Sequence, residues 1–190
     1  MKRFAIAGAV LGLAVVPGVT ATASGGATDP NSIQLSTGYV DTLRAGGNLP
    51  SGWGQSAVFV GNVGPYDAGA LLINNPSNNP LDVDDVSVNV GGTVTDLWGS
   101  FVVPPKSSAI LTQTASYNFD TSDENSQHCR ADGVIPTITV TVAQAPQHPF
   151  VFADTSQVLN TGGIDQDTCT TQPNESHNWV RAANISDSAG

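Results

Sequence analysis

The stretch TITVTV at residues 137–142 decides the fold class, because every residue in it is β-branched and an isoleucine or valine follows each threonine. In an extended chain, successive side chains point to opposite faces, so this alternation places apolar groups on one face and hydroxyls on the other. β-branched side chains also pack well on a pleated sheet. The stretch therefore predicts a β-strand with one face in a core and the other in water.

Outward from this stretch, short apolar runs recur about every ten residues. Residues 86–90, VSVNV, alternate strictly, and Gly91 and Gly92 after them predict a tight turn. Further apolar runs, separated by turns rich in glycine, proline or asparagine, lie at residues 57–63, 70–74, 97–103, 108–113 and 150–152, with a short last one at 158–159. No run after Ala57 keeps a helical period. We therefore expect an all-β, antiparallel β-sandwich over residues 57–182.

The segments on either side of this domain are less regular. Within residues 24–56, the apolar residues of the stretch 35–43 fall at helical spacing, but Gly38 weakens a helix, and a short strand through Tyr39 fits equally well. We predict residues 24–56 as a flexible or loosely structured segment and residues 183–190 as a polar C-terminal tail.

The first 23 residues have the three parts of a secretory signal peptide. Lys2 and Arg3 form a basic start, residues 4–16 are an unbroken apolar run, and small residues precede a predicted cleavage after Ala23. This run is too short to span a bilayer as a helix, which argues against the alternative of a permanent membrane anchor. We predict residues 1–23 as a cleaved signal peptide, and the mature chain as secreted, extracellular and without an integral membrane segment.

The predicted mature chain is strongly acidic. Cleavage leaves four basic residues against 16 acidic ones, a net charge of −12. Such a surface repels nucleic acid, and no cluster of lysine or arginine interrupts it, so we predict no nucleic-acid partner. The same surface suits solubility outside the cell and offers carboxylates to hard cations.

Both cysteines, Cys129 and Cys169, lie in the predicted mature chain. In an oxidising compartment an even pair predicts one disulfide bond, which would close a loop of about forty residues and contribute roughly 4 kcal/mol to stability. The alternative is a metal-binding or nucleophilic thiol, but the pair has no zinc-ligand spacing and lies in no reactive motif. We predict the Cys129–Cys169 disulfide.

Several segments resemble known extracellular domains. An asparagine–proline turn in residues 74–83 and a valine–proline turn in residues 102–111 are similar to turns of bacterial immunoglobulin-like and lamin-tail-like sandwich domains. Three later segments resemble an uncharacterised family of secreted bacterial proteins: NFDTSD at 118–123, QVLNTGGID at 157–165 and NESHNW at 174–179. The resemblance implies an immunoglobulin-like β-sandwich and export, and it assigns no catalytic residue. The chain departs from antibody-type domains, because Trp98 precedes both cysteines.

Acidic side chains are concentrated in the two segments that the disulfide would join. If it forms, five acids share one neighbourhood: Asp120, Asp123, Asp165, Asp167 and Glu175. Oxygen ligands on loops suit Ca²⁺, but the spacing matches no calcium-binding loop, and short acids in turns commonly bond their own backbone. We therefore predict no cofactor, with Ca²⁺ at these five acids as the alternative.

His177 is the candidate catalytic residue of an alternative function, a secreted hydrolase. Beside Glu175 it would act as a general base or a metal ligand. The chain has no Gly-x-Ser-x-Gly motif for a nucleophilic serine, and its acids do not form a recognisable glycosidase pair. A surface or turn histidine is the simpler interpretation, so we predict no catalytic residue.

Two of the three tryptophans are candidates for stacking against a sugar ring. Trp53 lies in the loop sequence PSGWG, and Trp179 follows a polar segment, whereas Trp98 lies in an apolar run and is predicted in the core. The predicted ligand-binding residues are therefore Trp53, Trp179 and His177. We expect a secreted or cell-surface-associated, non-enzymatic protein with a structural, adhesive or ligand-binding role, whose partner is an extracellular protein or glycan. The alternative is a hydrolase with its site in the acidic loops near His177.

Overall fold

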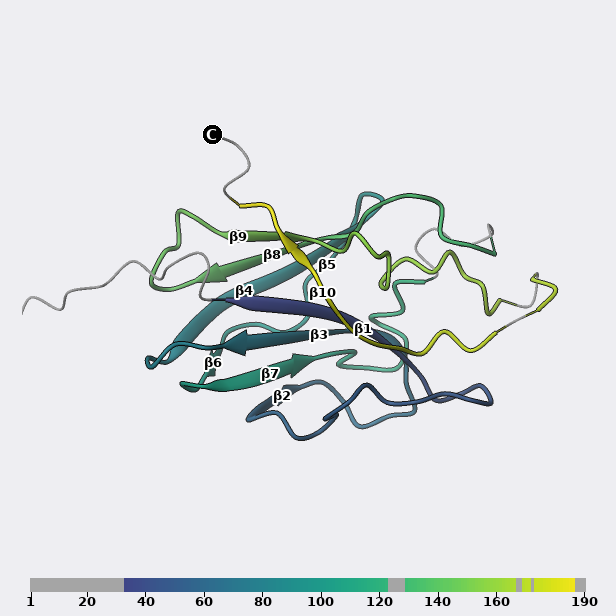
Figure 1. The fold of residues 1–190 in the computed structure, drawn as a ribbon, viewed down its shortest axis with the longest axis horizontal. Coiled ribbons are helices and arrows are strands. Elements are labelled where there is room, and N and C mark those ends of the chain that lie inside the picture. Colours follow the sequence, from purple (N-terminus) through teal and green to yellow (C-terminus); the bar gives the residue numbers. More distant parts are fainter. Residues whose placement is uncertain (1–32, 123–128, 167–168, 172, 187–190) are drawn as a thin grey trace, which may run out of the picture.

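The computed structural model describes residues 33–122, 129–166, 169–171 and 173–186. The predicted signal peptide and the acids Asp123 and Asp167 lie outside these residues. Within them the chain forms eleven β-strands, and no helix is present that is long and apolar enough to cross a membrane. The strands form two sheets that enclose one core (Figure 1). The predicted all-β sandwich is therefore confirmed.

The first sheet has five strands. In spatial order they are β10 (His177–Arg181), β1 (Gln34–Asp41), β3 (Asp67–Asn75), β7 (Ser107–Leu111) and β2 (Val58–Val60). Neighbouring strands are antiparallel except β2, which runs parallel to β7. The longest pairing in this sheet joins β1 to β3, with Gln34 opposite Asn74 and Asp41 opposite Asp67.

The second sheet has six strands, all antiparallel to their neighbours. Five of them follow the order β11 (Ala183–Asn184), β9 (Phe150–Ala153), β8 (Thr137–Val142), β4 (Leu81–Val90) and β5 (Thr93–Thr95), and β6 (Phe101–Val103) also pairs with β4. Strand β8 coincides with the TITVTV stretch. The short strand predicted at residues 158–159 is instead a turn, in which both side chains are buried.

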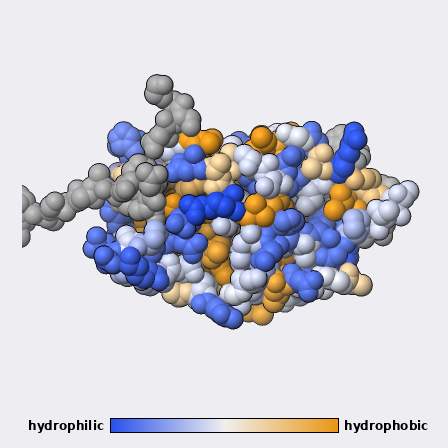
Figure 2. Space-filling view, viewed as in Figure 1, coloured by the Kyte–Doolittle hydropathy of each residue, from blue (hydrophilic) through white to orange (hydrophobic). Residues whose placement is uncertain are grey.

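The core lies between the sheets and follows the period-two pattern. In β8, Ile138, Val140 and Val142 are fully buried, while the threonines between them are only half-buried. Trp98 is also buried, and its indole N–H donates to the carbonyl of Thr112 at 2.7 Å, so no unpaired donor is left there. This confirms the predicted core role of Trp98. On the surface seen in Figure 2, hydrophobic side chains lie in small patches among hydrophilic ones.

Strands also lie outside the predicted bounds 57–182, before and after the domain. The segment 24–56 is not only loosely structured, because β1 lies inside the first sheet between β10 and β3. Of the two alternatives for this stretch, helix or short strand, the structure has the strand. The sequence left the choice open because the consecutive residues Tyr39 and Val40 are both fully buried, so that no apolar–polar alternation results. The polar tail 183–190 begins with β11, a two-residue edge strand that carries no apolar signal.

The long connections after β1, β7 and β9 gather at one end of the sandwich, which we call the loop end (Figure 1). Cys129 follows β7, Cys169 follows β9, and the two form a disulfide with their Cα atoms 5.5 Å apart. The predicted disulfide is therefore confirmed. It joins two of the three long connections and so limits their freedom to separate.

Candidate functional site

The outer face of the first sheet, which points away from the core, brings the two candidate tryptophans together. Side chains alternate across a sheet, so Leu35 and Leu71 point into the core and their neighbours along the strands point outward. Strand pairing places Gly38 beside Ala70 on this outer face. Trp179 of β10 lies directly over Gly38, where an added Cβ would come within 2.9 Å of its ring. The missing side chain at Gly38 is what allows the indole to pack on the strand.

Trp53 and Trp179 form a nearly parallel pair on this face, with ring centroids 6.1 Å apart and 17° between the ring planes. Phe59 and Tyr66 contact Trp53 in edge-to-face geometry, at centroid distances of 5.6 and 5.3 Å. Tyr66 is buried, whereas both tryptophans stay partly exposed. The result is an apolar surface that reaches solvent and is held in place by neighbouring rings.

Hydrogen bonds hold the loop that carries Trp53 against β10. The backbone N–H of Ser51 donates to Asn178 Oδ1 at 3.0 Å, and the Asn178 side-chain amide donates to Ser51 Oγ at 3.1 Å. The indole N–H of Trp179 donates to the Ser51 carbonyl at 2.9 Å. Because the loop and the strand are cross-linked in this way, the two tryptophan rings are held in fixed relative positions.

A buried ionic cluster at the loop end anchors the same loop. Arg44 Nη1 lies 2.9 Å from Asp67 Oδ2 and 3.6 Å from Asp41 Oδ2, and it also pairs with Asp165 Oδ2. Arg44 Nη2 donates to the Asp165 carbonyl at 3.2 Å. Burial lowers the pKa of the Arg44 guanidinium, but the surrounding carboxylates outweigh burial and raise this pKa above its ordinary value. Arg44 therefore stays charged and holds three acids together.

Two further acids and a tyrosine extend the cluster. The hydroxyl of Tyr39 donates to Asp120 Oδ1 at 2.7 Å, and Asp67 Oδ1 lies 3.3 Å from the same oxygen. Burial, together with these carboxylates, raises the pKa of Tyr39 well above its usual value. Thr161 donates to Glu175 Oε1 at 2.6 Å. Burial and the nearby carboxylates raise the pKa of Glu175 to about 7, so this acid is partly protonated at neutral pH.

The predicted calcium ligands are brought together only in part. Asp123 and Asp167 lie outside the described residues, so the full set stays a prediction, and three members lie in the cluster: Asp120, Asp165 and Glu175. Among the described residues, the acids around Arg44 are the one group of three whose oxygens lie within 4.8 Å of one another. Arg44 already supplies a cation there. The described cluster is thus an ion-pair network that fastens the connections of the loop end.

His177 lies exposed at the start of β10. Its Nδ1 is 2.9 Å from the backbone carbonyl of Asn178. In the part of the chain that the structure describes, the ring makes no hydrogen bond to a carboxylate. A catalytic histidine needs an acid or another group that orients it beside a substrate cleft, so this geometry gives the hydrolase alternative no support.

Sequence reasoning missed the residues that support the pair and the cluster. Phe59 belongs by pattern to an apolar run, and Tyr66 and Asp67 belong to a turn. Arg44 meets its partners only through the pairing of strands that lie far apart in the chain. One signal was available in the sequence. The predicted mature chain has only four basic residues, so an arginine three residues after Asp41 is a strong candidate for an internal counter-ion.

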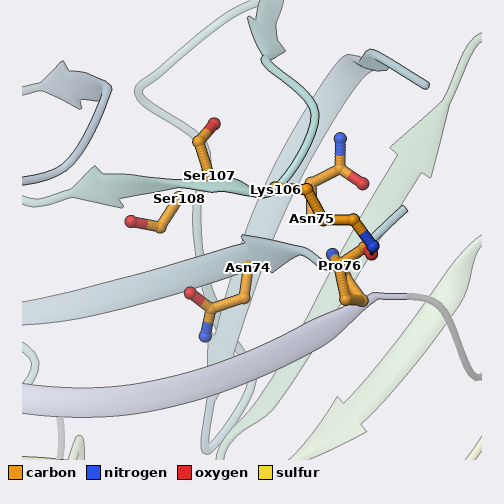
Figure 3. Close-up of a pocket in the computed structure, with 6 residues that line it drawn as sticks. All are labelled: Asn74, Asn75, Pro76, Lys106, Ser107 and Ser108. Carbon is orange, nitrogen blue, oxygen red and sulfur yellow. Dashed lines mark hydrogen bonds between the residues drawn. The ribbon is translucent and has the colours of Figure 1, made fainter. Parts of the chain in front are cut away.

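A shallow depression lies at the end of the outer face opposite the loop end. Its volume is about 390 Å³, and its lining consists of Asn74, Asn75, Pro76, Lys106, Ser107 and Ser108 (Figure 3). Lys106 Nζ donates to the Pro76 carbonyl at 2.5 Å. Asn74 of β3 and Ser108 of β7 are strand neighbours. The depression offers amide, hydroxyl and ammonium groups as hydrogen-bonding partners.

Comparison with known proteins finds no relative of this chain. No protein-family model matches it, and no curated protein or solved structure matches it significantly. Its function is therefore inferred from the arrangement of its own residues, above all the tryptophan pair and the contacts that support it.

Proposed function

We propose that the chain is a secreted, non-enzymatic β-sandwich that binds a glycan on the Trp53–Trp179 pair. The observation that carries this proposal is the pair itself, two nearly parallel and partly exposed indole rings on the outer face of a sheet. Sugar rings carry flat C–H surfaces that pack against aromatic rings. Extracellular polysaccharides are therefore the partner class that this surface fits best.

The way the pair is held supports binding over a purely structural role. An aromatic cluster that served packing alone would be stabilised further by complete burial. Here Trp53 and Trp179 keep part of their rings in solvent, although the loop that carries Ser51 and four neighbouring side chains hold them. These four are Val40, Phe59, Tyr66 and Ala70. The polar N–H of Trp179 is already paired with Ser51, so the ring surface left free is apolar.

Two features support an extracellular setting. A structural disulfide such as Cys129–Cys169 is typical of proteins in oxidising compartments. The first 23 residues have the composition of a secretory signal peptide.

The direct test is retention of the mature protein, residues 24–190, by neutral polysaccharides in affinity gels. Dextran, xylan, mannan and β-glucan form the panel. Trp53→Leu keeps apolar volume in the cluster and removes the flat ring, so we expect binding to the retained polysaccharide to weaken about thirtyfold. The control is Tyr117→Asn, which removes an exposed aromatic ring elsewhere and suits the positive φ of 63° at that position.

Two results would contradict the proposal. One is a Trp53→Leu protein that is retained as strongly as the parent. The other is a correctly folded parent protein that no polysaccharide of the panel retards. A matching thermal unfolding curve for Trp53→Leu would show that any lost retention reflects the missing ring.

A further inference from the structure

The outer face of the first sheet continues from the tryptophan pair into a polar row. Strand pairing places Gln34 of β1 opposite Asn74 of β3, and Asn74 opposite Ser108 of β7. All three side chains are half-buried. Gln34 lies four residues from Gly38 on β1 and Asn74 four residues from Ala70 on β3, so both point to the outer face, and Ser108 lies on that face because it pairs with Asn74. The row borders the depression that contains Lys106.

Between the pair and the polar row lies one intermediate row. It holds Ser36 of β1, flanked by Leu72 of β3 and by the exposed Arg181 of β10. Gly38, under Trp179, and Gln34 are four residues apart on one strand, which corresponds to about 13 Å. A single sugar ring cannot cover this distance, whereas a short chain of rings can.

We propose that the glycan site extends along β1 and β3 from the Trp53–Trp179 pair to the Gln34–Asn74–Ser108 row, so that the ligand is a neutral polysaccharide chain lying along the strands. This inference rests on the proposed function and adds the direction of the ligand, its length and its charge. At the aromatic end, the Trp53–Trp179 pair packs against one sugar ring of the polysaccharide. The polar row hydrogen-bonds the hydroxyl groups of another.

The charge distribution selects a neutral chain. The outward positions of β1, β3 and β7 between the two ends carry no aspartate or glutamate, and Arg181 and Lys106 flank them. The carboxamides of Gln34 and Asn74 and the hydroxyl of Ser108 hydrogen-bond sugar hydroxyls without burying a charge. An anionic polymer would instead be repelled by the net charge of −12 on the predicted mature protein.

The test compares affinities for oligosaccharides of increasing length, from disaccharide to hexasaccharide, prepared from each of the four neutral polysaccharides. For the parent protein we expect affinity to rise with length and then to level off. The double variant Asn74→Ala/Ser108→Ala should bind the long oligosaccharides about tenfold more weakly, because two hydrogen bonds are lost. Its affinity for the shortest oligosaccharide that binds should be unchanged. Thr139→Ala, on the outer face of the second sheet, is the matched control.

Different results would overturn the extended site and the binding of a glycan by the tryptophan pair. If Trp53→Leu abolishes binding while the double variant binds long oligosaccharides like the parent, the site is confined to the pair and the extension is wrong. Affinity that does not change with length overturns the extension in the same way. Stronger retention by polygalacturonate than by its methyl-esterified form would contradict the neutral ligand.

Discussion

The outer face of the first sheet carries Trp179, Leu72 and Asn74, whereas the outer face of the second sheet carries the half-buried threonines of β8 and an acid, Asp85. Both faces arise from the same alternation of side chains along strands. The first face has aromatic rings and no carboxylate on its outward strand positions. On the second face, burial and the neighbouring Asp96 raise the pKa of Asp85.

The difference between the two faces comes from a loop as well as from the strands. The connection after β1 folds over the first sheet, places Trp53 beside Trp179, and is fastened at the loop end by Arg44. The same period-two strands therefore produce the proposed binding surface only where a distant segment completes it. This is consistent with the general observation that rigid sheets position functional residues carried by loops.

The largest expected effect comes from removing the cation that fastens this loop. Arg44→Met leaves three buried carboxyl groups without their counter-ion, so we expect the free energy of unfolding at neutral pH to fall by about 4 kcal/mol. Urea denaturation measures this free energy of unfolding. Arg130→Met, at an exposed position, is the control, and an equal loss in both variants would show that the loop end does not depend on this network.

A smaller effect is expected from the pH dependence of the same cluster. The pKa of Glu175 is raised to about 7 from an ordinary value of 4.5, so the folded state keeps a proton that the unfolded state releases. The stability that this raised pKa of Glu175 provides is fully present below pH 4.5 and is lost as the pH rises through 7. It amounts to at most about 3 kcal/mol of unfolding free energy. Glu175→Gln should flatten the fall in unfolding free energy over this interval. An unchanged pH profile in that variant would contradict the assignment.

A third prediction concerns the close approach of Trp179 to the first sheet. Gly38→Ala places a Cβ within 2.9 Å of the indole ring, so the ring has to shift. Overpacking of this kind costs about 2 kcal/mol, and we also expect weaker glycan binding although no aromatic residue is removed. Thermal unfolding and affinity gels measure the two effects. Retained stability with parental affinity would mean that the position of Trp179 over Gly38 is unimportant.

The smallest effect is expected on the second face. Asp85→Asn removes a carboxyl group that lies beside Asp96, so we expect stability at neutral pH to increase by a few tenths of a kcal/mol. The gain should disappear in acid, where the carboxyl groups are protonated. Glycan retention should be unchanged. A loss of retention would indicate that the ligand binds the second sheet, which would contradict the proposed site.

The sequence was sufficient for those features that depend on local pattern. Strand β8 follows from strict alternation, the core position of Trp98 from its apolar neighbours, and the disulfide from an even cysteine count. Strand β1 could be predicted only as one of two alternatives, because its side chains are buried on both faces and Gly38 interrupts its pattern. The reason for a glycine at position 38 is visible only in the structure, where the ring of Trp179 lies over it.

The candidate site could be predicted only as separate parts. Trp53 and Trp179 each stood out from their local context, but their contact depends on the pairing of β10 with β1. The meeting of Arg44 with Asp67 and Asp165 likewise depends on the pairing of β1 with β3 and on the connection after β9, which reaches the same end of the sandwich. No local pattern encodes such convergence.

The most direct measurement uses the three indole N–H signals of the mature protein in a ¹H–¹⁵N spectrum during titration with a neutral hexasaccharide that the protein binds. We predict that the signals of Trp53 and Trp179 shift together and saturate, while that of the buried Trp98 stays in place. Shifts confined to the strands of the second sheet, with the signals of Trp53 and Trp179 unmoved, would contradict this prediction.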